Sequence, residues 1–290
     1  MAKTRYVLPA SLGRACTTRH SGMQTPNMIS SLVANRYLIY QLVRREVVLK
    51  YRGSVLGLGW SFLYPLLLLA AFTLVFGGVF GGRWGEASEG RSGIHMALFI
   101  YCGLAVFTPF AEVMTNAPRL LLSNQNFVKK IVFPTEILPV VSLLAASLHG
   151  LAHLALLALG AFLVGHHHLS ALLMTIVLLP AWLFTLGLAW FITAAGAYLR
   201  DLAHGIPVLA QLLMFVLPVF YPGNAAPGVL KTLNTYNPLA RAMEDMRGVL
   251  LTGQYPDWTI WLSTFAMGAA SALLGYVFFM RCREEFADVL

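Results

Sequence analysis

Apolar residues along this chain gather in six long stretches that hold almost no charged side chains. The stretches cover residues 60–80, 96–113, 137–164, 170–198, 206–221 and 258–280. A helix needs about 20 apolar residues to cross a hydrocarbon core of about 30 Å, and most stretches reach that length, the fifth being the shortest. A buried helix of a soluble protein explains one such stretch but not six. The pattern predicts an all-α integral membrane protein with six transmembrane helices.

A different pattern precedes the first stretch. In residues 31–52 apolar side chains recur at helical spacing, as at Leu32, Leu42 and Val47, and basic residues take other positions. This spacing predicts an amphipathic interface helix, which either lies on the cytoplasmic membrane surface or packs on the protein; both can hold at once. Residues 1–30 are polar and lack the apolar core of a secretory signal, so the first span is expected to direct insertion. We therefore expect a flexible cytoplasmic extension over residues 1–30 and one membrane domain over residues 31–290.

Two connecting segments carry helix signals of their own. After the second stretch, Ser123 is placed to cap a short cytoplasmic helix, and Pro134 ends that segment before the third stretch. In residues 222–258, Asn237 and Pro238 mark the start of a short amphipathic helix and Gly253 its end. We expect one or two such helices at the periplasmic face, before the last span.

The charges agree with a membrane protein and give it an orientation. Hydrophobic residues make up 58% of the chain and charged residues 11%, against about 25% charged in a typical soluble domain. If the N-terminus is cytoplasmic, 15 of the 20 Lys and Arg residues fall on the cytoplasmic side, as the positive-inside rule requires. Both termini are thus expected in the cytoplasm. The net charge of +8 then reflects topology and anionic lipid, and no nucleic-acid surface is indicated.

Little in the sequence suggests chemistry at a metal or a nucleotide. Cys16, Cys102 and Cys282 are too far apart for a disulfide framework or a metal site, and no phosphate-binding GxxxxGK[ST] loop occurs. His149 and His153 have metal-ligand spacing, but no carboxylate or cysteine partner is evident, so hydrogen bonds between helices are the preferred interpretation. Three adjacent histidines, 166–168, cannot readily converge on one metal from a tight turn. We expect no metal, no bound cofactor and no enzymatic activity.

Four segments in register resemble one known family. They are LKYRGSVLGLGWSFLYPLLLLAAFTLVFGGVFG at 49–81, LLSNQNFVKKIVFPTEILP at 121–139, YLRDLAHGIPVLAQLLMFVLPVFYP at 198–222 and YNPLARAMEDMRGVLL at 236–251. Together they resemble the membrane (permease) subunit of type-2 ABC exporters, which move lipid-linked polysaccharides such as O-antigen, capsule and teichoic acid. The resemblance spans most of residues 36–251, and it implies a location in the inner membrane of a bacterial cell.

This resemblance implies a homodimer bound to two separate ABC ATPase subunits, which carry the ATP and Mg²⁺. The implied substrate is a glycan on undecaprenyl pyrophosphate, O-antigen foremost, which passes through a channel between the two copies. Capsule, teichoic acid or a small lipophilic compound are alternatives within the family. A proton-driven flippase would need more spans and buried acidic residues, and neither is evident; Glu112 is interpreted as interfacial. A membrane transferase would need catalytic polar groups, which the outer segment does not offer.

The resemblance also places an entrance for the substrate just before the first span. A pyrophosphate needs clustered cations, and arginine grips it with two parallel hydrogen bonds, so Arg52 is expected to receive it together with Lys50 or Arg45. The entrance loop that follows contains Gly53, Leu56 and Gly57, and its glycines permit close approach of backbone to ligand. Ordinary anchoring of these cations to lipid is the alternative.

Aromatic side chains are candidates for the wall of the channel, because sugars present CH-rich faces that stack on rings. The set comprises Phe72, Phe76, Phe80, Phe107, Phe220 and Tyr221, with Phe110 and Phe215 as further candidates. The first three are spaced four residues apart on one helix face. Helix packing or contact with lipid is the alternative for each of them.

Contact with the ATPase is expected at two cytoplasmic loops that match the family's coupling region. These loops contain Phe127, Lys129, Lys130, Arg200 and Asp201. For Arg200 and Asp201 a local charge pair or lipid contact is the alternative.

Overall fold

The computed structural model describes residues 28–75, 93–125, 133–225 and 227–286, and all regular secondary structure in them is helical. Four helical segments are long and apolar enough to cross a membrane: Ile94–Ser123, Ile137–Leu163, Leu169–Tyr198 and Trp258–Glu285. Two shorter apolar helices cover Trp60–Leu74 and Leu202–Val216. The predicted all-α class is confirmed, and the count of six spans stays a prediction.

The α-helices are α1 (Met28–Ala34), α2 (Arg36–Tyr51), α3 (Trp60–Leu74), α4 (Gly93–Asn116), α5 (Leu120–Ser123), α7 (Ile137–Leu163), α8 (Met174–Tyr198), α9 (Leu202–Val216), α10 (Gly228–Tyr236), α11 (Pro238–Arg247) and α12 (Trp258–Cys282). Short 3₁₀ turns are η1 (Gly57–Gly59), η4 (Ala117–Arg119), η5 (Leu169–Leu173), η6 (Gly223–Ala225) and η8 (Arg283–Glu285), and η7 (Gly248–Thr252) is π-helical.

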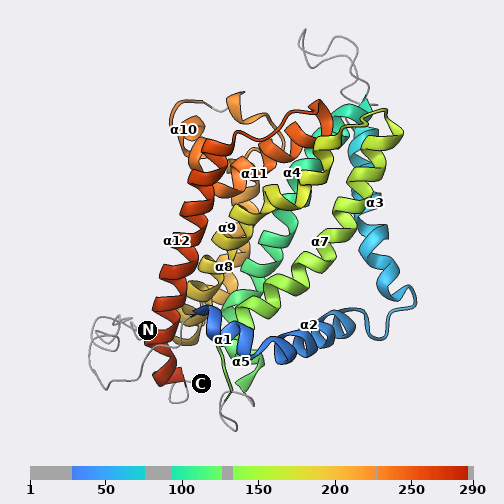
Figure 1. The fold of residues 1–290 in the computed structure, drawn as a ribbon. Coiled ribbons are helices and arrows are strands. Elements are labelled where there is room, and N and C mark those ends of the chain that lie inside the picture. The colour runs from blue at the N-terminus through green and yellow to red at the C-terminus, as the bar shows by residue number, and fades with distance from the viewer. Residues whose placement is uncertain (1–27, 76–92, 126–132, 226, 287–290) are drawn as a thin grey trace, which may run out of the picture.

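The long helices α4, α7, α8 and α12 form a bundle, and α3 rises along one side of it (Figure 1). Helices α1, α2 and α5 lie at one end of the bundle, and α10 and α11 lie at the other. Helix α2 crosses its end of the bundle and packs Ile39, Leu42 and Val43 inward, with contacts to α7. Tyr37 and Tyr40 on its other face are exposed. The amphipathic segment is therefore helical and packs on the protein, and its contact with a membrane surface stays a prediction.

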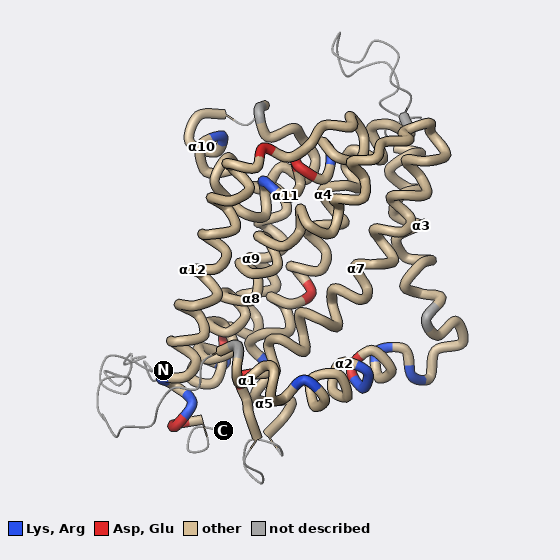
Figure 2. The backbone as a smooth tube through the Cα atoms, viewed as in Figure 1, with Lys and Arg blue, Asp and Glu red and all other residues tan. Residues whose placement is uncertain are grey.

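Charged residues cluster at the two ends of the bundle, and the long helices between them are almost free of charge (Figure 2). Basic residues follow α2 and the adjacent end of the bundle, and a few more lie near α10 and α11. This distribution is what the cost of placing a charge in hydrocarbon requires.

The boundary of the fifth stretch differs from the prediction of 206–221. Helix α9 begins at Leu202 and ends at Val216, and Leu217 has an extended backbone. The reason is Pro218, because a proline disfavours helical geometry in the residue before it and has no N–H to continue the helix. Of the first stretch, residues 76–80 lie outside the described part of the chain.

Small residues bring α8 and α12 into very close contact along their length. A Cβ atom at Gly275 would fall on the backbone carbonyl of Gly187, and one at Gly187 would fall on the backbone of Ser271. One at Gly268 would meet the carbonyl oxygen of Pro180. Close backbone approach through glycine is the usual way in which helices associate in a membrane, where no hydrophobic effect drives them together.

The predicted helix signals have mixed outcomes. Asn237 caps α11, its side chain accepting from the backbone N–H of Leu239 at 2.9 Å, and Gly253 ends η7 with φ of +71°, so both predictions are confirmed. Ser123 is the last residue of α5, and its hydroxyl donates to the Leu120 carbonyl at 3.2 Å. The short helix that it was expected to cap lies outside the described residues, so that expectation stays a prediction.

Candidate functional site

The loop between α2 and α3 has the backbone geometry that its glycines suggest. Gly53 has φ of +83° and Gly57 has φ of +50°, a region that other residues rarely adopt. These two residues turn the chain from α2, which crosses the end of the bundle, into α3, which runs along it. Arg52 and Leu56 are exposed on this loop.

The three predicted pyrophosphate ligands differ in their contacts within the subunit, and their role stays a prediction. The Lys50 ammonium donates to Glu112 Oε1 at 2.7 Å. Arg45 Nη2 donates to Asn124 Oδ1 at 3.3 Å, in the segment that follows α5. The structure gives Arg52 no ion pair among the described residues, so a ligand can approach its guanidinium without displacing a carboxylate.

Glu112 is the centre of a polar cluster that joins three helices. It comes from α4, Lys50 comes from the last turn of α2, and His149 comes from α7. Besides Lys50, its Oε1 lies 3.3 Å from His149 Nδ1, and Lys50 Nζ lies 3.0 Å from the same nitrogen. The expectation that His149 lacks a carboxylate partner is therefore wrong. The sequence did carry a signal, since Glu112 is a lone acid in an apolar stretch and such a residue requires a partner.

A cavity of about 280 Å³ opens beside this cluster, between α2, α3, α4 and α7. Tyr51, Trp60 and Tyr64 form aromatic parts of its wall, and His153 also lines it. His153 Nδ1 is hydrogen-bonded to the Tyr101 hydroxyl at 2.9 Å, which confirms the expected hydrogen bonding between helices at this position. Among the described residues no group of histidine, cysteine and carboxylate side chains is arranged to hold a metal.

Glu46 lies on α2 one turn before Lys50. Burial raises the pKa of its carboxyl, and the charge of Glu112 raises that pKa further, although Arg45 opposes the effect. The ion pair of Lys50 with Glu112 at 2.7 Å fixes the end of α2 to α4.

Aromatic candidates fall into two groups. Phe107 and Phe110 lie in the core of the subunit, 5% and 3% exposed, which favours helix packing for them. Phe72 of α3, Phe215 of α9 and Phe220 beyond α9 lie together, with ring centroids 6.4 Å apart for Phe72–Phe220 and 5.8 Å for Phe215–Phe220.

This second group is partly exposed, Phe215 by 61%. Phe76 and Phe80 lie outside the described residues, and Tyr221 donates its hydroxyl to the Val216 carbonyl. The channel role of the exposed aromatics stays a prediction.

The predicted ATPase contacts are described only in part. Arg200 and Asp201 are exposed in the turn between α8 and α9. Arg119 Nη2 donates to the Ala203 carbonyl at 3.3 Å, which connects η4 to the first turn of α9. Phe127, Lys129 and Lys130 lie outside the described residues. Contact with an ATPase stays a prediction for all five candidates.

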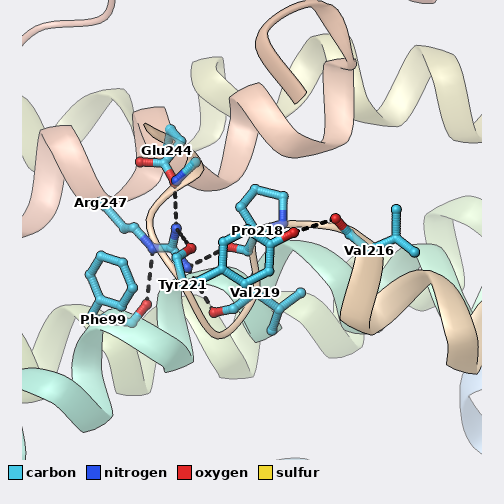
Figure 3. Close-up of polar contacts among 8 residues, drawn as sticks. Phe99, Val216, Pro218, Val219, Tyr221, Glu244 and Arg247 are labelled. Atoms are coloured by element: carbon cyan, nitrogen blue, oxygen red, sulfur yellow. Dashed lines mark hydrogen bonds and ion pairs between the residues drawn. The ribbon is translucent and has the colours of Figure 1, made fainter. Parts of the chain in front are cut away.

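At the opposite end of the bundle, Arg247 of α11 is the centre of a dense hydrogen-bond cluster (Figure 3). Its Nε donates to the Phe99 carbonyl at 3.2 Å, and the Phe99 ring centroid lies 3.8 Å from its Cζ atom. Its Nη2 donates to the carbonyls of Pro218 and Val219 at 2.7 and 2.8 Å. Its Nη1 donates to Glu244 Oε1 at 2.6 Å and to the Tyr221 carbonyl at 3.3 Å.

These five contacts use all five N–H groups of the guanidinium. They join α4, the broken segment after α9 and α11. Gly103 of α4 makes room, because a Cβ atom there would lie 2.9 Å from the Val219 backbone. Sequence reasoning missed this cluster, since Arg247 is one of the five Lys and Arg residues outside the 15 assigned to the cytoplasmic side and no role was expected for it.

Two further acids are buried, which corrects the expectation that buried acidic residues are absent. Glu136, 2% exposed, accepts from the Ser31 hydroxyl at 2.8 Å and pairs with Arg283 at 3.1 Å, so it ties α1 and η8 to the start of α7. Asp245, 5% exposed, pairs with Arg241 at 2.8 Å. Burial raises the pKa of Asp245 to about 6.

Comparison with known proteins gives a consistent result. The profile of the family described as ABC-2 type transporter matches residues 37–251. An O-antigen export system permease protein, RfbA, from Klebsiella pneumoniae is 24% identical over 258 residues, which cover 87% of this chain and 95% of that protein. A protein of the same description from Myxococcus xanthus is 25% identical over 268 residues, 90% of this chain and 98% of its own.

Proposed function

The chain belongs to the ABC-2 type transporter family, and we propose that it is the membrane subunit of an ATP-driven exporter of lipid-linked O-antigen. Membership makes it a multi-pass membrane protein and a transport subunit, which implies partnership with an ATPase subunit. The match to O-antigen export permeases over nearly their whole length is the observation that carries the proposal. The apolar helices and the polar entrance region support it.

In the proposed exporter two copies of this chain form the channel, and two ATPase subunits bind the ATP and Mg²⁺. The substrate is a glycan on undecaprenyl pyrophosphate, which enters from the cytoplasmic side of the inner membrane. We place α2 and both chain ends on that side. A surface suited to the second copy is available, since Ala210 is the sole buried residue of α9 and Val208, Leu212 and Phe215 are more than half exposed.

Purification with the partner subunit tests this function. Gentle extraction of the tagged protein from its native membrane is expected to bring an ABC ATPase with it at equal stoichiometry, identified by mass spectrometry. A strain lacking the gene is expected to retain lipid-linked glycan in the cytoplasm and to lose it from the surface, and the sugar composition of that glycan distinguishes O-antigen from capsule or teichoic acid. Absence of an ATPase, under conditions that preserve other membrane complexes, contradicts the proposal.

Arg52→Gln is expected to lower export of the glycan roughly 10- to 100-fold, because a charged hydrogen bond to phosphate contributes about 1.5–3 kcal/mol. Arg52 is exposed at the entrance loop, so its loss leaves no buried partner and assembly with the ATPase is expected to be unchanged. Surface glycan is measured by immunoblot, and assembly by co-purification.

Arg36→Gln is the matched control, because Arg36 is an exposed cation at the other end of α2. Equal export by both variants would remove Arg52 from the site.

A further inference from the structure

We propose that the cavity between α2, α3, α4 and α7 is a binding subsite for one neutral sugar unit of the exported glycan. The proposal rests on the proposed function and adds to it a place where the chain touches the sugars rather than the lipid carrier. The cavity belongs to a single subunit, so it is distinct from a channel between two copies.

Aromatic side chains give the cavity a wall on which a sugar ring can stack. Trp60 and Tyr64 lie one turn apart at the start of α3, 44% and 55% exposed, and Tyr51 from α2 adds a third ring. With a volume of about 280 Å³, the cavity is close to the lower limit of small-molecule sites, about 300 Å³. A ligand of one sugar ring fits such a space, and a long polymer does not.

Polar groups converge on the same space with both donors and acceptors. Glu112 offers a carboxylate, Lys50 an ammonium, and Ser61 and Thr108 hydroxyl groups. His149 lines the cavity, and its Nε2 is buried without a hydrogen-bond partner among the described residues. A buried polar atom that lacks a partner costs about 1–3 kcal/mol, which a ligand hydroxyl would recover.

The balance of charge favours a neutral ligand over a phosphate. Lys50 is the only Lys or Arg among the lining residues, and it is already neutralised by Glu112 at 2.7 Å. An incoming phosphate would have to approach that carboxylate, whereas a sugar hydroxyl can donate to it. Arg52, outside the cavity on the loop that leads to Trp60, remains for the anion. The geometry therefore separates a sugar position from a pyrophosphate position.

The test uses the complex with its ATPase in lipid nanodiscs and a panel of methyl glycosides of glucose, galactose, mannose, rhamnose and N-acetylglucosamine. Saturation-transfer NMR is expected to detect saturable binding of at least one glycoside. Trp60→Ala is expected to weaken that binding about tenfold or more.

Trp258→Ala is the matched control, because Trp258 is a similarly exposed tryptophan, 50%, at the other end of the bundle. Tyr64→Ala repeats the test with an exposed residue, should Trp60→Ala fail to assemble.

Three results would overturn the proposal. The first is that no glycoside binds the wild-type complex, and the second is that binding survives both Trp60→Ala and Tyr64→Ala. The third is that inorganic pyrophosphate displaces the glycoside, which would assign the cavity to an anion.

Complementation of a deletion strain distinguishes failure of the sugar-subsite proposal from failure of the proposed function. If the wild-type gene restores export and Trp60→Ala restores it equally, the subsite is wrong and the function stands. If deletion leaves export intact while glycosides bind, the function is wrong.

Discussion

Gly275→Ala should leave little correctly folded protein, with a loss of roughly 3 kcal/mol or more in the free energy of unfolding. The new methyl group would occupy the position of the Gly187 carbonyl, and a backbone cannot rotate out of the way as a side chain can. Helices α8 and α12 would have to separate along the most extensive helix–helix contact among the described residues. The effect is measured as the thermal midpoint of a fluorescent fusion, followed by size-exclusion chromatography in detergent.

The matched control is Gly205→Ala on α9. A Cβ atom there meets nothing within 4 Å, and alanine favours a helix over glycine by about 1 kcal/mol. This variant is expected to keep or slightly raise the thermal midpoint. Gly187→Ala combined with Gly275→Ala should cost less than the sum of the two, because both act on one contact. Equal midpoints for Gly275→Ala and Gly205→Ala would show that the two helices are not packed as described.

Arg247→Met should cost about 3–5 kcal/mol, the range seen when one partner of a buried charged cluster is removed. The substitution takes away donors from the carbonyls of Pro218, Val219 and Tyr221 and leaves Glu244 without its cation. Arg247→Lys is expected to restore only part of the loss, since an ammonium has three donors and cannot match the planar fork of a guanidinium. Unfolding in detergent and protease sensitivity of the segment after α9 are the two measurements.

Lys231→Met, an exposed cation on neighbouring α10, serves as the control and should leave both measurements unchanged. Glu244→Gln should have a smaller effect than Arg247→Met, because the amide oxygen still accepts from Arg247 and from the Gly223 N–H, which lies 2.8 Å from Glu244 Oε1. A wild-type midpoint for Arg247→Met would show that other contacts hold this end of the bundle.

The fold was largely predictable because a long apolar stretch that crosses a membrane forms a helix, which satisfies all its backbone hydrogen bonds internally. The third stretch was expected over 137–164 and the helix covers Ile137–Leu163, and the last was expected over 258–280 and the helix covers Trp258–Cys282. The pattern failed at α9, where hydropathy continues through residues 217–221 but the helix does not. Hydropathy reflects the free energy of transfer into lipid, so a hydropathy pattern does not reveal that Pro218 ends the helix.

The polar clusters were harder to predict, since they join residues distant in the chain. Lys50 and Glu112 are 62 residues apart, and Arg247 and Phe99 are 148 apart. Glu112, a lone acid in an apolar stretch, indicated that it has a partner but not which residue that partner is. Arg247 had a sufficient local explanation as a charge of the outer segment. The turn between α2 and α3, in contrast, could be predicted from sequence because its glycines act locally, through the φ angles of Gly53 and Gly57.

If α9 is the fifth span, as predicted, its early end has a consequence for the surrounding lipid. Its 15 residues rise about 22 Å, which is less than the hydrocarbon thickness of about 30 Å. A helix shorter than the bilayer is accommodated by local thinning of the bilayer or by association with other helices, at a fraction of a kcal/mol for each ångström of mismatch. The free-energy cost of this mismatch therefore rises with the acyl-chain length of the lipids. Contact of α9 with neighbouring helices lowers that cost.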